Sequence, residues 1–161
     1  MLHHVSVGVR DVERAARLYD AALAALGYKR VAAYLPYAIG YGMTAPSFWV
    51  QLPHDQQTAS PGNGVHVGFS ARDKRAVHKF HEAALANGGT DNGGPGPREM
   101  YGPDYYGAFV IDLDGNKLEA TLHAEAFVAQ TAKRKAVKKR TRKPARPPAK
   151  KRAKKKKARR R

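Results

Sequence analysis

The segment HVSVGVRDVERAARLYDAALAALG, residues 4–27, indicates the architecture of the protein, because a related segment begins 62 residues later. The second copy, HVGFSARDKRAVHKFHEAALANGG, spans residues 66–89, and nine of its 24 positions are identical to the first. Alanine-rich segments match easily by chance, so the signal lies in the His-Val and Arg-Asp pairs at constant spacing. An internal repeat of this kind predicts two similar structural modules in one chain.

Each copy is expected to begin as a strand and continue as a helix. In the first copy, valines alternate with small or polar residues, which is typical of a strand with one buried face. An aspartate follows in each copy, Asp11 and Asp73, at a position that suits a helix N-cap. The apolar residues after it recur at helical spacing, and glycines stand where the helices should end.

After each helix the hydrophobic pattern returns to a period of two, which predicts three more strands per module. These strands are expected near residues 28–34, 37–43, 47–52, 89–92, 105–112 and 116–122. We therefore predict an α+β fold of two βαβββ modules, residues 1–53 and 64–123. The Pro/Gly-rich segment 54–63 is expected to link them, and the Gly/Pro-rich loop 93–103 is expected to cover a site.

The segment YYGAFVIDLDGNKLEA, residues 105–120, predicts a hairpin whose second strand carries a carboxylate between two apolar residues. Those neighbours suit the helix-packed face, so Glu119 is expected to project from the other face. His4 and His66 alternate with helix-facing valines and are expected to share that face. Two histidines and one carboxylate are the set that binds a divalent metal facially and leaves positions for substrate.

The turn of this hairpin determines what lies beside the carboxylate. A two-residue turn at Asp114-Gly115 would pair Val110 with Glu119. Cross-strand partners share a face, so this pairing would place Tyr106 on the side of Glu119.

About 123 residues of the chain resemble the vicinal oxygen chelate superfamily, which includes glyoxalase I, extradiol dioxygenases and the bleomycin- and fosfomycin-resistance proteins. The resemblance rests on HHVSVGVRDVERAARLYDAAL, FWVQL, VHVGFSARDKRAVHKFHEAAL and YYGAFVIDLDGNKLEA. It implies paired modules forming an incomplete barrel around a divalent metal (iron, manganese, zinc or nickel), in a chain that often dimerises. The family's ligands fall on His4, His66 and Glu119, and the substrate it implies is small and vicinally oxygenated.

The chain departs from the glyoxalase branch, which has a fourth ligand, a glutamate, on the last strand of the first module. Here that strand offers only Gln51, which argues against glutathione-dependent glyoxalase activity. Glu119 and Tyr106 are the expected catalytic residues, with Tyr106 a hydrogen-bond donor to a developing oxyanion. The expected substrate contacts are Trp49, Gln51 and Arg98.

Beyond the predicted domain, residues 1–128, a Lys/Arg-rich tail at 129–161 is expected to be disordered. Residues 133–161 contain 19 Lys or Arg and no acid, whereas residues 1–132 hold 11 basic and 13 acidic residues. Such a tail predicts sequence-independent binding to nucleic acid. The expected contacts are Lys138, Lys139, Arg140, Lys150, Lys151, Arg152, Lys154 and Lys155.

Composition excludes several classes of protein. The chain has no cysteine, so disulfides, thiolate metal sites and a cysteine nucleophile are ruled out. No run approaches the roughly 20 apolar residues of a membrane span, and the N-terminal residues lead us to expect no signal peptide. We expect a cytoplasmic homodimer, or a nucleoid-associated protein if the tail binds DNA.

These observations leave three functional hypotheses. The leading one is a divalent-metal-dependent enzyme, a lyase, isomerase or dioxygenase acting on a small oxygenated substrate. The second is a small-molecule binding or resistance protein without turnover. The third is a protein that acts mainly by binding nucleic acid through its basic tail.

Overall fold

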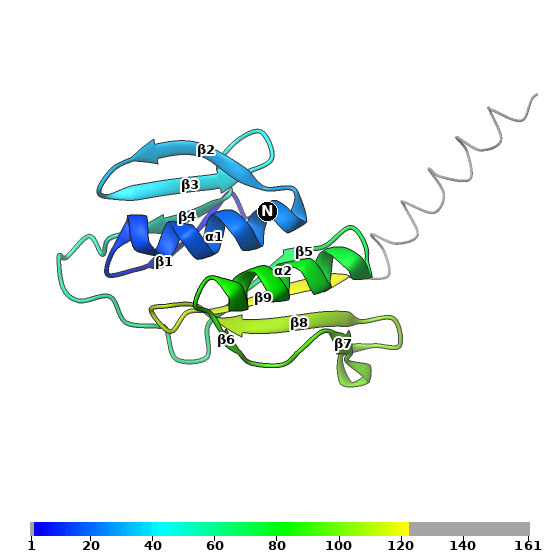
Figure 1. The fold of residues 1–161 in the computed structure, drawn as a ribbon. Coiled ribbons are helices and arrows are strands. Elements are labelled where there is room, and N and C mark those ends of the chain that lie inside the picture. Colours follow the sequence, from blue (N-terminus) through cyan, green and yellow to red (C-terminus); the bar gives the residue numbers. More distant parts are fainter. Residues whose placement is uncertain (1, 123–161) are drawn as a thin grey trace, which may run out of the picture.

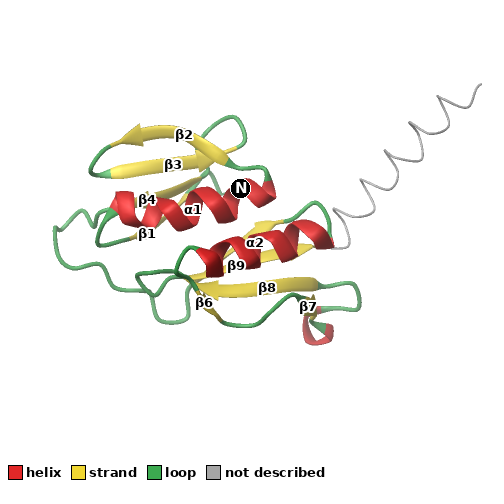
Figure 2. Cartoon of the chain, viewed as in Figure 1, coloured by secondary structure: helices red, strands yellow, loops and turns green. Residues whose placement is uncertain are grey.

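The computed structural model describes residues 2–122, which form two similar modules, each with one helix and one sheet (Figures 1 and 2). The predicted nucleic-acid contacts between residues 138 and 155 lie outside the described residues. Within residues 2–122, no helix has the length and apolar character needed to cross a membrane.

The first module contains one helix and a four-stranded sheet. Its elements are β1 (Val5–Gly8), α1 (Val12–Leu26), β2 (Lys29–Tyr34), β3 (Ala38–Gly42) and β4 (Phe48–Gln51). The strand order is β1-β4-β3-β2, with β1 parallel to β4 and the other pairs antiparallel.

The second module repeats this plan. Its elements are β5 (His66–Ser70), α2 (Lys74–Ala86), β6 (Thr90–Asp91), β7 (Gly96–Pro97), a 3-10 turn (Glu99–Tyr101), β8 (Tyr106–Ile111) and β9 (Lys117–Leu122). The order is β5-β9-β8-β6, β7 pairs with β8, and β5 runs parallel to β9 as β1 does to β4. The predicted pair of α+β modules is confirmed, while β7 and the 3-10 turn were not predicted. The described strands form two separate sheets and no closed barrel.

The helices begin at the predicted caps. The Asp11 carboxylate accepts a hydrogen bond from the backbone N–H of Arg14 at 2.9 Å. The Asp73 carboxylate accepts one from the N–H of Ala76 at 2.8 Å, so both caps satisfy a helix N–H that would otherwise lack a partner. Gly27 ends α1 with φ of 89°, a left-handed conformation that suits glycine.

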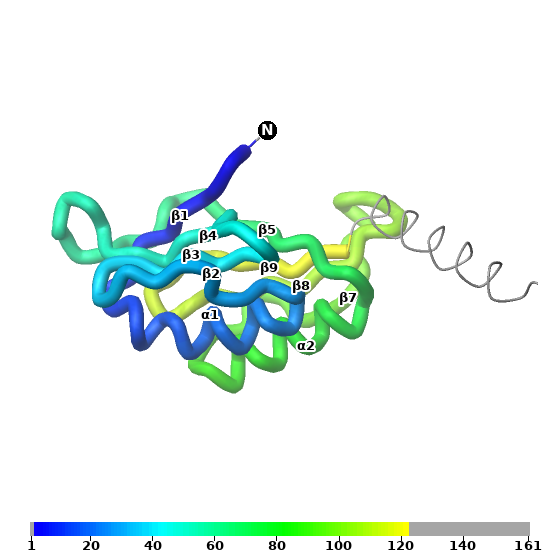
Figure 3. The backbone as a smooth tube through the Cα atoms, turned by 90° about the horizontal axis from the view of Figure 1, so that it is seen from above, coloured from blue at the N-terminus to red at the C-terminus, as the bar shows by residue number. Residues whose placement is uncertain are grey.

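Both helices lie on the same side of the two sheets and pack against each other (Figure 3). A single apolar core between helices and sheets contains residues of both modules. The ring of Phe48 meets that of Phe69 across the module boundary, edge to face, with 5.0 Å between centroids. This shared core orients the modules, and it leaves the opposite side of the sheets, here called the helix-free face, without a covering helix among residues 2–122.

The β8–β9 hairpin differs from the prediction by one residue of register. The backbone N–H of Asp112 donates to the carbonyl of Asn116 at 2.9 Å, so the loop has three residues rather than two. Gly115 takes the left-handed position in this loop, with φ of 95°. Glu119 therefore pairs with Phe109, and the predicted pairing with Val110 is wrong.

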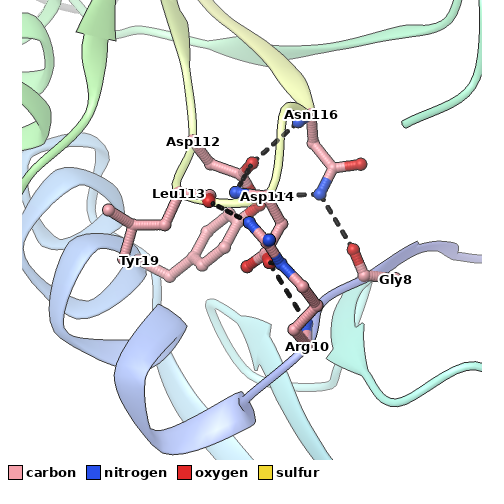
Figure 4. A network of polar contacts seen from close by, with 7 residues as sticks. All are labelled: Gly8, Arg10, Tyr19, Asp112, Leu113, Asp114 and Asn116. Carbon is pink, nitrogen blue, oxygen red and sulfur yellow. Dashed lines mark hydrogen bonds and ion pairs between the residues drawn. The ribbon is translucent and has the colours of Figure 1, made fainter. Parts of the chain in front are cut away.

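A polar network attaches this hairpin to the first module (Figure 4). The hydroxyl of Tyr19 on α1 donates to Oδ2 of Asp112 at 2.6 Å. Oδ1 of Asp112 accepts from the N–H groups of Asp114 and Asn116, at 2.9 and 2.7 Å. The side-chain amide of Asn116 donates to the carbonyl of Gly8 at the end of β1, at 3.0 Å. Asp112 is 6% exposed, and the Tyr19 hydroxyl and the two backbone N–H groups compensate for burying its charge.

An ion pair extends the network at the surface. Nε of Arg10 lies 2.5 Å from Oδ1 of Asp114, and Nη2 of Arg10 donates to the carbonyl of Leu113 at 2.9 Å. The first module thus contacts four residues in and beside the hairpin loop, Asp112, Leu113, Asp114 and Asn116, and the loop leads directly into β9.

Candidate functional site

Parallel pairing of β5 and β9 brings the predicted site residues of the second module together. His66 pairs with Lys117, and Gly68 pairs with Glu119. Because alternate residues of a strand share a face, His66, Lys117 and Glu119 all project from the helix-free face. The face predicted for His66 and Glu119 is confirmed.

Glu119 is the centre of a buried polar cluster. It is 2% exposed, and its Oε2 lies 3.3 Å from Nε2 of His66. The hydroxyl of Tyr105 donates to the other carboxylate oxygen, Oε1, at 2.5 Å. The side chain of His66 is 47% exposed, so the cluster reaches the surface through the imidazole.

Two glycines leave room for this carboxylate. A Cβ atom at Gly107 would lie 2.9 Å from Oε1 of Glu119, and one at Gly68 would lie 3.4 Å from Oε2. A side chain at Gly107 would therefore press on the carboxylate or on Tyr105. The backbone of β5 and β8 is close to Glu119 because neither strand carries a side chain there.

Tyr105 remains a proton donor at neutral pH. Burial raises the pKa of its hydroxyl, and the hydrogen bond to Glu119 raises that pKa further. The phenol therefore keeps its proton and orients the carboxylate.

Tyr106, the predicted catalytic tyrosine, lies on the opposite face. Its hydroxyl is 2.7 Å from Nε2 of His78 on α2, and Nζ of Lys74 lies 4.8 Å from its ring centroid. The one-residue shift of the hairpin reverses the two faces of β8, so the predicted position of Tyr106 beside Glu119 is wrong. Tyr105 takes that place, and a three-residue loop with glycine at its last position was the signal that could have identified it.

His4 does not join the cluster. Its Nδ1 lies 2.8 Å from Nδ1 of His3, and its side chain is exposed. It lines a pocket of about 190 Å³ at the module boundary together with Val67 and Gly68. Among residues 2–122, no group of three or more His, Cys, Asp or Glu side chains is placed to hold a metal ion.

The described part of the first module offers no further ligand at the position equivalent to Glu119. Glu119 pairs with Gly68 of β5, and the residue of β1 that corresponds to Gly68 is Ser6, which pairs with Trp49. Gln51, taken from the sequence as the fourth-ligand position, pairs two residues further along, with Gly8. Trp49 is half-buried and stacks on Tyr34 with 6.1 Å between centroids.

The described donors therefore do not complete the metal centre that the family resemblance implies. His66 and Glu119 are adjacent, but His4 is bonded elsewhere and an indole occupies the fourth position. We assign no reaction step to a metal.

Two cations lie near the cluster. Nζ of Lys117 is 4.9 Å from the ring centroid of Phe109, and Cζ of Arg98 is 5.5 Å from the same centroid. The ring of His66 is 6.4 Å from the ring of Phe109, edge to face.

Arg98 was predicted as a substrate contact, whereas Lys117 and Phe109 were not. Of the other predicted contacts, Gln51 lines a groove of about 940 Å³ beneath the linker, on the first module.

Comparisons with known proteins agree with this architecture. Residues 1–120 match the model of the Glyoxalase/Bleomycin resistance protein/Dioxygenase superfamily. A search of curated proteins finds no match. Among solved structures, a glyoxalase/bleomycin resistance protein from Albidiferax ferrireducens T118 is 37% identical, with a TM-score of 0.68, covering 75% of this chain and 97% of that one.

More distant structures share the fold. A glyoxalase-related enzyme from Fulvimarina pelagi is 22% identical with a TM-score of 0.61, over 76% of this chain and 88% of that one. A glyoxalase/bleomycin resistance protein/dioxygenase family enzyme from Burkholderia phytofirmans PsJN is 19% identical with a TM-score of 0.57, over 75% and 97%. With its paired modules and the family match over residues 1–120, the chain belongs to the glyoxalase/bleomycin resistance protein/dioxygenase superfamily.

Proposed function

We propose that this protein transfers a proton on a small oxygenated molecule bound at the helix-free face of its second module. The observation that carries the proposal is the chain of contacts from Tyr105 to Glu119 to His66. It joins a buried carboxylate, a protonated phenol and an exposed imidazole. The same elements, a base and a group that orients it, recur in acid–base sites.

Exposure separates the roles of these residues. Glu119 is 2% exposed, so it acts through His66 rather than on the substrate. Nε2 is the ring nitrogen that lies 3.3 Å from the carboxylate, so we assign Nδ1 as the nitrogen that accepts a proton from the substrate. The carboxylate then stabilises the imidazolium, and Tyr105 holds the carboxylate in position.

The reaction that fits this arrangement is enolisation. The imidazole takes a proton from the carbon next to a carbonyl, and the C–H electron pair forms the enolate double bond while the carbonyl π electrons move to oxygen. Return of the proton to the neighbouring carbon, with the matching hydroxyl proton moved to the other oxygen, isomerises an α-hydroxy carbonyl compound. No oxidant or reductant is required.

The test is hydrogen–deuterium exchange at carbon in small α-hydroxy ketones such as dihydroxyacetone, followed by NMR in D₂O. We expect His66→Gln and Glu119→Gln to lower kcat by about a hundredfold or more, with KM changed less. Tyr105→Phe should lower kcat by a smaller factor. Tyr106→Phe is the matched control, since its hydroxyl contacts α2, and it should exchange at the wild-type rate.

Two results would contradict the proposal. One is absence of catalysed exchange by the wild-type protein. The other is equal rates for Tyr105→Phe and Tyr106→Phe together with normal exchange by Glu119→Gln, because the cluster would then have no part in the chemistry.

We propose metal-dependent chemistry as the second candidate. The 3.3 Å between Nε2 of His66 and Oε2 of Glu119 is within the span of two donors on one ion, given bonds of about 2.0–2.2 Å. Such an ion would supply a Lewis acid. Calorimetric titration with Zn²⁺ and Mn²⁺ tests this: binding lost in His66→Gln and Glu119→Gln supports it, and weakening in His4→Gln would add the third predicted ligand. Equal metal binding by wild type and Glu119→Gln would refute it.

A separate candidate function concerns the tail. The 19 Lys or Arg residues without an acid in residues 133–161 favour binding to nucleic acid through phosphate contacts. We expect mobility shifts of any duplex DNA that weaken steeply with salt and are lost in a 1–132 truncation. Tight, salt-resistant binding by the truncated chain would contradict this reading.

A further inference from the structure

We propose that His3 and His4 together bind a copper(II) ion, with coordination positions left open for water or a small ligand. The inference goes beyond the proposed function, because neither histidine belongs to the cluster around Glu119. It is carried by the contact between the two imidazoles, whose Nδ1 atoms lie 2.8 Å apart.

The two histidines precede the first strand, and this position allows their side chains to meet. Within a strand, consecutive side chains point to opposite faces of the sheet. β1 begins only at Val5, whose backbone N–H donates to the carbonyl of Ser47 at 3.1 Å, so both histidines lie outside that alternation. Their rings stand edge to face at 83°, with 5.1 Å between centroids. Both side chains are exposed, so each ring can turn toward a shared ion without disturbing the apolar core.

The separation of the two nitrogens matches that of two neighbouring donors on one ion. Imidazole nitrogens bind a metal at about 2.0–2.1 Å, so two donors at a right angle are roughly 2.9 Å apart, and two at a tetrahedral angle roughly 3.3 Å apart. The observed 2.8 Å fits the right angle. Square-planar or tetragonal geometry is typical of copper(II) and nickel(II), whereas zinc sites are tetrahedral.

The same contact shows what the pair gives up when a metal binds. Without a metal it is a hydrogen bond, in which one Nδ1 carries the proton and the other accepts it. A metal needs the lone pairs of both Nδ1 atoms, so the proton moves to Nε2 of its ring, which is the other neutral tautomer of imidazole. Because the rings are exposed, water can accept a hydrogen bond from Nε2–H, and the change of tautomer costs little.

The surroundings of the pair favour an ion that prefers nitrogen. Both histidines line the pocket of about 190 Å³ at the module boundary, together with Tyr28, Ser47 and Gly68. The described residues that line this pocket include no Asp or Glu, so calcium and magnesium, which need oxygen ligands, have no carboxylate here. Imidazole suits copper, nickel and zinc, and copper(II) binds a given set of donors most tightly of the three. The pocket has room for waters that complete the coordination.

The test titrates copper(II) alone into the full chain, prepared without an affinity tag, and follows visible absorption and electron paramagnetic resonance. We expect a copper(II) site with an axial spectrum and hyperfine coupling from imidazole nitrogen. His3→Gln and His4→Gln should each weaken this site by about tenfold or more, since loss of even an outer partner of a metal ligand costs this much. His54→Gln, which removes an exposed histidine of the linker, is the matched control and should bind copper(II) like wild type.

Glu119→Gln separates this site from a metal held by His66 and Glu119. Copper(II) should keep its affinity and spectrum in that variant, and His3 has no part in the other candidate site. The proposal is overturned if wild type binds no copper(II), or if either His3→Gln or His4→Gln binds it as wild type does. It is also overturned if His54→Gln loses as much affinity as His3→Gln, which would indicate scattered binding by surface histidines. Loss of the copper(II) spectrum in Glu119→Gln would likewise overturn it, because the ion would then belong to the buried cluster.

Discussion

Replacing Tyr19 by phenylalanine tests how the first module supports the site. The substitution keeps the buried ring, which packs against Phe48 with 5.5 Å between centroids. It removes one hydrogen bond, the 2.6 Å contact from the hydroxyl to Oδ2 of Asp112. The Asp112 carboxylate lies at the start of the loop between β8 and β9, the strand that carries Glu119.

The expected loss follows from the contacts that remain. A hydrogen bond to a charged acceptor contributes about 1.5–3 kcal/mol. Asp112 keeps donors from the backbone of Asp114 and Asn116 and from the Asn116 side chain, so its charge is not left unpaired. We therefore expect a loss of about 2 kcal/mol in the free energy of unfolding. For a domain of this size the melting temperature should fall by roughly 6–10 °C.

Urea unfolding followed by circular dichroism measures this loss. Tyr28→Phe is the control, because its ring packs against Phe69 at 5.7 Å and its hydroxyl has no hydrogen bond to a residue within 2–122. That variant should lose less than about 0.5 kcal/mol. If Tyr19→Phe also loses less than this, or if the two variants lose the same amount, the hairpin network does not stabilise the fold as argued.

Three further predictions address other parts of the molecule. Gly107→Ala places a Cβ 2.9 Å from Oε1 of Glu119, so the rate of hydrogen–deuterium exchange at carbon should fall about tenfold or more. Circular dichroism should show that the variant is folded. A normal exchange rate would mean that the position of the carboxylate is not critical. Arg10→Gln should lower the free energy of unfolding by about 1 kcal/mol. This loss should be smaller in high salt, because the Arg10 side chain is half exposed. Urea unfolding at two salt concentrations measures the difference. Burial, and then Asp20, raise the pKa of Tyr41, so its stabilising effect is complete below the ordinary tyrosine pKa of about 10 and is lost as pH rises above it. Urea unfolding between neutral pH and about pH 11 should show this alkaline loss, and Tyr41→Phe should reduce it; an equal loss in that variant would assign it to other groups.

The modules could be predicted well from the sequence because their signals are local. Alternation within a strand decides which residues share a face, so the residue pattern alone was enough to place His66 and Glu119 on one face. Caps at Asp11 and Asp73 are likewise set by residues three positions apart.

Relations between strands depend on loop length, and there the prediction was wrong. The dipeptide Asp114-Gly115 suits both two- and three-residue loops. The choice is made by Asp112, whose carboxylate binds the backbone of Asp114 and Asn116 and favours the longer loop. Because the loop is one residue longer than predicted, Tyr105 rather than Tyr106 lies beside Glu119.

The constant offset of 62 residues between the two repeats could not predict which residue of the first module lies at the fourth-ligand position. His4 and His66 are 62 residues apart, but Trp49 and Glu119, which hold equivalent places in the two sheets, are separated by more than this. The additional residues include β7 and the 3-10 turn of the second module. The offset therefore aligns the first half of each module and fails for the last strand.

The two modules have diverged on the helix-free face while keeping the same backbone plan. At equivalent positions the first module carries the indole of Trp49, stacked on Tyr34, and the second carries the buried carboxylate of Glu119. The titratable cluster and the cations beside it thus belong to one module. The other contributes the core contacts and, through Tyr19, the network that holds the hairpin before Glu119. Under the proposed function, the second module would supply the reactive groups and the first would support their geometry, so one carboxylate at the centre would be enough.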